Sequence, residues 1–245
     1  MWDLLLTIFG FFVGIIASLT GMGGGAFIVP ILTLIYDFVP ANAVGTSLTS
    51  ITFTAIASTL NYARQKRIYY KTGLILTVTT VPGAFIGARL TSIISPNQLG
   101  LIFGFFIIFV ALHMIVDVND FRRRKNSSEK VQLVLKSDKE VISSGKTILL
   151  EAGLSFFGGL ASGLLGIGGG VLVVPITVFA LKMPMHMATA TSMFTMIMTS
   201  ISGVAEHYMA NHIHFEYALL LALGTIFGAQ VGAYVSKKNF RQGTS

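Results

Sequence analysis

The sequence predicts an all-α membrane protein, a polytopic helical bundle built from two inverted-topology repeats. Three observations support this fold class: an apolar composition, long apolar runs separated by basic loops, and a glycine-rich motif that occurs twice. Of the 245 residues, 53% are apolar and only 11% are charged, against roughly 25% charged in an ordinary soluble domain. A soluble fold of this size cannot hide so much apolar surface, so the composition excludes a water-soluble protein.

The apolar runs and the residues that break them predict the helices in order. In the first half, segments 4–20 and 26–36 flank the motif GMGGG (21–25), and helices follow at 43–61, 72–94 and 98–116. In the second half, segments 147–165 and 171–181 flank the motif GIGGG (166–170), and helices follow at 187–205 and 216–236. About 20 residues cross a bilayer, so the length allows eight or nine crossings. The segments after the motifs are too short to cross, so we expect each motif at the tip of a helical hairpin.

The charges predict the domain organisation and the orientation. We expect a first transmembrane repeat over 1–116, a polar cytoplasmic linker over 117–146, a second transmembrane repeat over 147–236 and a basic cytoplasmic tail over 237–245. Every Lys and Arg except Arg89 falls in loop 64–71, in the linker, at Lys182 or in the tail. Positive charge marks the cytoplasmic side, which predicts a plasma-membrane protein with its N-terminus outside and its C-terminus inside. The net charge of +7 is spread among these segments. It is therefore interpreted as a signal of membrane topology, and we expect no nucleic-acid partner.

The sequence matches itself at an offset of 145 residues without a gap. The first glycine motif then falls on the second, Val29-Pro30-Ile31 falls on Val174-Pro175-Ile176, and Thr46-Ser47 falls on Thr191-Ser192. Five predicted crossings separate the two copies, and an odd number turns the second copy upside down. Inverted repeats are typical of secondary transporters, whose site lies at the repeat interface where short, interrupted helices meet.

The glycine motifs are the predicted substrate site. A helix start exposes unpaired N–H groups and carries a partial positive charge, and glycines let an anion approach that backbone closely. The candidate residues are Gly21, Gly23, Gly24, Gly25, Gly166, Gly168, Gly169 and Gly170. The alternative interpretation is that these glycines serve only close helix packing.

Hydroxyl side chains and one arginine complete the predicted site. Thr46, Ser47, Thr191 and Ser192 open one hydroxyl stripe in each half, which offers donors to a dehydrating anion. The alternative for these hydroxyls is bonding to carbonyls of their own helix. Arg89 is predicted to draw anions to the outer mouth, or to reach lipid headgroups.

The paired GxGGGxxxVP motifs, each followed by Ala-x-x-Thr-Ser, resemble the TauE/SafE sulfite-exporter family. The resemblance extends over nearly the whole chain. It implies a multi-pass plasma-membrane transporter and not an enzyme. The implied substrate is a small sulfur oxyanion or an organosulfonate. The expected partners are the lipid bilayer and a second copy of the chain in a homodimer. In the family pattern a further helix, the counterpart of 98–116, usually follows position 236, and this sequence departs from the pattern because it ends at Ser245 without that helix.

Three other functions stay open. A passive anion channel is the main alternative, because no Asp or Glu lies clearly within a membrane core to carry a coupling ion. Soft-metal transport is suggested by Met185, His186 and further methionines at 183, 187, 193, 196 and 198. An intramembrane protease would need Ser162 and His113 as its catalytic pair. We expect no cofactor and no bound metal, and zero cysteines exclude thiolate chemistry.

Labelling of single cysteines tests the predicted orientation. In intact cells or spheroplasts, a cysteine at position 127 should react only after the cytoplasmic side is opened, and one at position 211 should react from outside. The cysteine-free background needs no prior substitution. Reaction of both positions from one side would contradict the inverted repeat.

Overall fold

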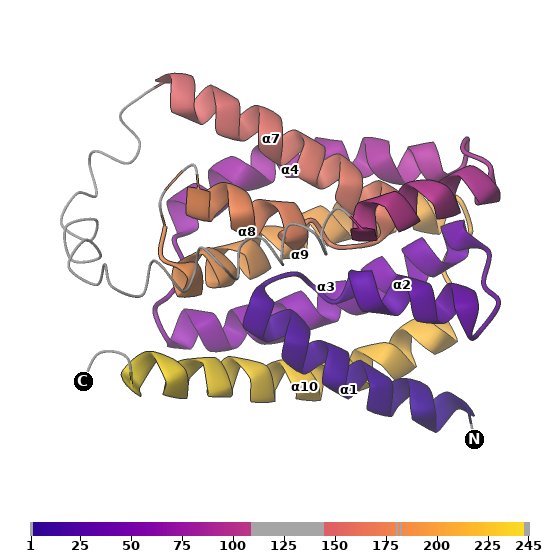
Figure 1. Ribbon diagram of the computed structural model, residues 1–245, viewed down its shortest axis with the longest axis horizontal. Helices are drawn as coiled ribbons and strands as arrows, with labels where there is room; N and C mark the ends of the chain where they lie inside the picture. The colour runs from indigo at the N-terminus through magenta and orange to yellow at the C-terminus, as the bar shows by residue number, and fades with distance from the viewer. Residues whose placement is uncertain (1, 109–144, 180, 182, 243–245) are drawn as a thin grey trace.

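The computed structural model describes residues 2–108, 145–179, 181 and 183–242, and this part of the chain is helical without strands (Figure 1). The helices are α1 (Trp2–Thr20), α2 (Gly25–Leu34), α3 (Pro40–Arg64), α4 (Tyr70–Thr91), an unlabelled helix Pro96–Ile108, α7 (Gly145–Leu165), α8 (Gly170–Phe179), α9 (Met185–Met209) and α10 (Phe215–Gln242). The predicted helical fold is confirmed. Most of the predicted linker 117–146, together with His113, lies outside the described residues.

Four of the described helices are long and apolar enough to cross a membrane. They are Pro40–Arg64, Tyr70–Thr91, Met185–Met209 and Phe215–Ser236. By contrast, α2 and α8 have 10 residues each, which gives a length of about 15 Å against a hydrocarbon core of about 30 Å. Each short helix reverses direction after a glycine motif, so the predicted helical hairpins are confirmed (Figure 1).

The two hairpins point toward each other. In Figure 1 the α1–α2 hairpin lies toward the right and the α7–α8 hairpin toward the left, and their glycine turns come together between them. The arrangement of the helices does not by itself say which side of the membrane each hairpin faces, so the inverted topology stays a prediction.

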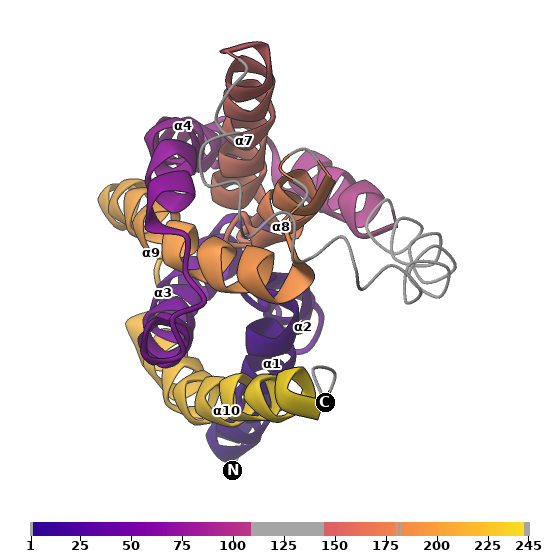
Figure 2. The same ribbon diagram turned by 90° about the vertical axis from the view of Figure 1, so that its left-hand side faces the viewer.

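Each half of the chain packs its outer helices against the other half. Helix α1 lies along α10, and α4 lies along α7 (Figure 2). Glycines make both contacts close: a methyl group on Gly159 of α7 would lie 2.1 Å from the carbonyl oxygen of Thr80, and one on Gly228 of α10 would lie 2.0 Å from that of Phe11. Small residues at crossings are how helices associate in membranes, where lipid tails remove the hydrophobic drive.

The bundle has an apolar exterior and hydroxyl groups inside. Along α10, Leu219, Leu223, Phe227 and Val231 are exposed at four-residue spacing, whereas Thr225 is fully buried. In water such an exposed apolar stripe would promote aggregation, whereas in a membrane it can contact lipid. This arrangement agrees with a multi-pass membrane protein.

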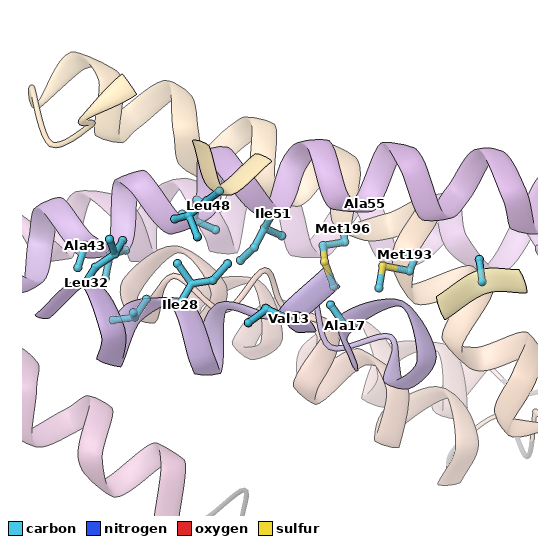
Figure 3. Close-up of a cluster of buried hydrophobic side chains, with 14 of the residues drawn as sticks. Val13, Ala17, Ile28, Leu32, Ala43, Leu48, Ile51, Ala55, Met193 and Met196 are labelled. Carbon is cyan, nitrogen blue, oxygen red and sulfur yellow. The ribbon is translucent and has the colours of Figure 1, made fainter. Parts of the chain in front are cut away.

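An apolar cluster occupies the centre, where α3 and α9 pass the two hairpins. Leu48 and Ile51 of α3 and Met193 and Met196 of α9 are fully buried there, together with Val13 of α1 (Figure 3). The central cluster therefore fixes the positions of the helices on which the two glycine turns rest.

Substitution of a packing glycine should destabilise the protein. A methyl group on Gly83 of α4 would lie 2.4 Å from the carbonyl oxygen of Phe156, so Gly83→Ala should cost about 1–3 kcal/mol of stability. The control is Gly100→Ala, because nothing lies within 4 Å of its added methyl group. Thermal unfolding in detergent measures both variants; equal melting temperatures would contradict the close α4–α7 contact.

Candidate functional site

Two glycine turns, residues 21–24 and 166–169, connect the helices of the two hairpins. In the first turn Gly21, Gly23 and Gly24 have φ of 79°, 80° and 87°, and their counterparts at 166, 168 and 169 have 70°, 81° and 79°. A side chain in this left-handed region costs about 1–2 kcal/mol per residue, which explains why both motifs need glycine. The turns end where α2 begins at Gly25 and α8 begins at Gly170.

The two turns lie directly against each other. A methyl group on Gly25 would lie 2.0 Å from the carbonyl oxygen of Gly166, and one on Gly170 would lie 2.0 Å from that of Gly21. The starts of α2 and α8 are therefore brought to one place. Their first N–H groups have no acceptor within the helix, and both helix ends carry partial positive charge.

Two serines join the turns to the opposite half. The Ser47 hydroxyl donates to the carbonyl oxygen of Gly166 at 2.9 Å, and the Ser192 hydroxyl donates to that of Gly21 at 2.9 Å. Both serines are buried. They were expected to face the substrate, and the structure brings them to the turns as donors to carbonyl groups.

The two predicted threonines lie next to the turns but bind elsewhere. The Thr46 hydroxyl accepts the N–H of His214 at 3.1 Å, and the Thr191 hydroxyl accepts the N–H of Tyr69 at 3.1 Å. Thr46 therefore anchors the loop before α10, and Thr191 anchors the loop before α4. Further along the stripes, the hydroxyls of Thr54 and Thr199 donate to carbonyls four residues back in their own helices, as the packing interpretation expects.

Arg89 is not brought to the turns. It is exposed in the last turn of α4, and it is not among the groups that surround either turn in the described part of the chain. Its predicted role at an outer mouth stays a prediction.

Two apolar side chains that the sequence did not single out as site residues cover the turns. A methyl group on Gly23 would lie 2.6 Å from Sδ of Met196, and one on Gly168 would lie 2.8 Å from Cγ2 of Ile51. Ile51 and Met196 are 145 residues apart, so they hold equivalent positions in the two halves (Figure 3). The self-match of the sequence could have paired them, but only the fold shows that they reach the turns.

A model of the family "Sulfite exporter TauE/SafE" matches residues 6–242. The chain belongs to the TauE/SafE family. This assignment agrees with the long apolar helices described above, and it makes the protein a membrane transporter with a small-molecule substrate.

Curated relatives in the TauE/SafE family are similar over most of their length. The chain is 33% identical to the probable membrane transporter protein YunE of Bacillus subtilis over 96% of this chain and 88% of YunE. It is 31% identical to a probable membrane transporter protein of Methanocaldococcus jannaschii, over 96% of this chain and 86% of that protein. No solved structure matches.

The residues predicted for soft-metal transport lie in several places: Met193 and Met196 pack in the central apolar cluster, and Met183 packs in another cluster. Met185 is exposed, and no group of three His, Asp or Glu side chains within the described ranges is placed to hold a metal ion. The histidines near the end of α9 make protein contacts: Nε2 of His207 lies 3.2 Å from the carbonyl oxygen of Gly163. Burial lowers the pKa of His212 in the following loop, which favours its neutral form.

Loss of either cross-turn serine should destabilise this TauE/SafE protein. Ser47→Ala or Ser192→Ala leaves a buried glycine carbonyl without its donor, which costs about 1–3 kcal/mol. Thr52→Val is the control, because the Thr52 hydroxyl donates to Leu48 of its own helix. Unfolding in detergent should show a larger loss of stability for both serine variants than for the control. Equal losses of stability would contradict a stabilising role of the cross-turn hydrogen bonds.

Proposed function

We propose that this protein is a secondary transporter that moves a small oxyanion, sulfite-like or organosulfonate-like, across the plasma membrane. The backbone N–H groups at the starts of α2 and α8 hold the anion near the midplane. One observation carries the proposal: two half-length helices begin at glycine turns that touch each other in the centre of the protein. Discontinuous helices whose N-termini meet are the arrangement that transporters use for anionic groups.

The proposed site binds an anion without a buried cation. A Lys or Arg at a helix centre costs about 2.5–3.5 kcal/mol on the insertion scale, whereas oriented N–H groups add no such charge. The turn glycines, with their positive φ, carry no side chains of their own over the backbone, although Met196 and Ile51 approach from α9 and α3. The site thus avoids the cost of a buried charged side chain.

The substrate class comes from the family description, which names a sulfite exporter. The relatives are named only as probable membrane transporters, so the choice of sulfite or sulfonate belongs to the proposal. The proposal also keeps the N-terminus outside, the C-terminus in the cytoplasm and Arg89 at the outer mouth as secondary features. The hydroxyls of Thr46 and Thr191 accept N–H groups and can still donate to the substrate. Ser47 and Ser192 would donate to the substrate only after releasing the glycine carbonyls.

Thermal stabilisation by ligands tests the proposed function. A ligand that binds only the folded protein stabilises it by about 2.7 kcal/mol at a hundredfold excess over Kd. Sulfite or methanesulfonate should raise the melting temperature of the purified protein, and chloride at the same ionic strength should not. Stabilisation by none of these anions would refute the oxyanion site.

Flux through proteoliposomes separates a transporter from a passive channel. A transporter should saturate with anion concentration and carry little current. A channel should carry large currents that reverse at the equilibrium potential of the anion. Flux that does not saturate and carries large currents would show a channel instead of a transporter. The proposed selectivity for oxyanions would not be affected by that result.

A further inference from the structure

The two turns differ on the side that faces the preceding helix of their own hairpin. A methyl group on Gly24 would lie 2.6 Å from Cγ1 of Val13 and 3.3 Å from Cβ of Ala17, so α1 closes this side of the first turn. A methyl group on Gly169 would lie 3.4 Å from its nearest neighbour, which is Cβ of Ser162. The second turn therefore has room for a methyl group on this side, where the first turn has none.

The sequence explains this difference. At the offset of 145 residues, Val13 is matched by Gly158, and Ala17 is matched by Ser162. The second half thus lacks the valine side chain and has a hydroxyl in place of a methyl hydrogen. The carbonyl oxygen of Gly158 lies 3.5 Å, and Oγ of Ser162 lies 3.6 Å, from the methyl position on Gly169.

The Ser162 hydroxyl has no hydrogen-bond partner in the described part of the chain, although its side chain is 0% exposed. Buried hydroxyls normally find a partner, so a fully buried one without a partner can donate to a ligand. Some other buried hydroxyls lack partners too, including Ser155 and Ser200. Ser162 differs from these two because its oxygen faces the glycine that precedes α8.

We propose that the second turn is the oxyanion-binding turn and that Ser162 is a substrate-binding residue. The Ser162 hydroxyl donates to one oxygen of the anion, and the free N–H groups at the start of α8 bind the others. The first turn, closed by Val13 and Ala17, has a structural role. This inference rests on the proposed function and narrows it, because the start of α8 alone now holds the anion in place of the starts of α2 and α8 together.

The ligand class follows from the donors. A hydroxyl and several N–H groups at different angles suit an anion with two or three oxygens, such as sulfite or a sulfonate head group. Chloride is one acceptor atom, whereas an oxyanion offers a separate oxygen to the hydroxyl and to the N–H groups. Selectivity for oxyanions over chloride should therefore depend on Ser162.

Titration calorimetry of the purified full chain with sulfite tests this assignment. Ser162→Ala should weaken sulfite binding about tenfold or more, because a hydrogen bond to a charged group is lost. This variant carries the residue that the first half has at the equivalent position, so folding should be kept. Ser155→Ala is the matched control on α7, another fully buried serine without a described partner, and its affinity should stay within twofold of the wild type.

A second variant tests the open space instead of the hydroxyl. Gly158→Val introduces the valine that closes the first turn, so it should abolish sulfite binding while the melting temperature shows a folded protein. If this variant does not fold, Ser162→Ala decides alone.

The possible results separate the two proposals. Wild-type affinity in Ser162→Ala, or an equal loss in Ser155→Ala, would overturn the role of Ser162 while sulfite binding by the wild type upholds the proposed function. No binding of sulfite or methanesulfonate by the wild type would overturn both.

Discussion

A helix that breaks inside a bilayer must have its freed backbone groups satisfied by the protein, because no lipid atom can do so. The rest of this structure depends on that constraint. The carbonyls of Gly21 and Gly166 receive hydroxyls from Ser192 and Ser47 of the opposite half. The N–H groups at the starts of α2 and α8 have no such partner within their helices, so the same breaks that need bracing also leave donors for an anion.

The bracing makes each half depend on the other. Helix α1 packs along α10 and α7 packs along α4, while each turn receives its serine from the other half. Two groups of glycine serve this arrangement in different ways. Those at the turns adopt positive φ, and those in the long helices let backbones approach to distances that a Cβ would prevent. Neither half has a complete set of contacts alone.

Apolar periodicity and breaker residues predicted the helices and the hairpin turns from the sequence. The boundary of α3 shows the limit: a start at 43 was expected, but Pro40 fits the first turn of a helix and extends it to Pro40–Arg64. Side-chain partners were harder to predict, because they depend on how helices cross. Thr46 and Thr191 bind loop N–H groups, and Ile51 and Met196 cover the turns. The stripes alone gave no means to separate these roles.

The near-equivalence of the two turns has a mechanical consequence. Rocking of one repeat against the other around a fixed site is how inverted-repeat transporters alternate access. The hydrogen bonds of Ser47 and Ser192 join the two halves of the chain at the turns. On our proposal of an inverted-repeat transporter with its site there, such a motion must pivot near these bonds or break both. A pivot there keeps the starts of α2 and α8 together while the outer ends of the hairpins move. On our proposal, an anion at the start of α8 then travels with the α7–α8 hairpin, and the Val13 side of the first turn stays closed throughout.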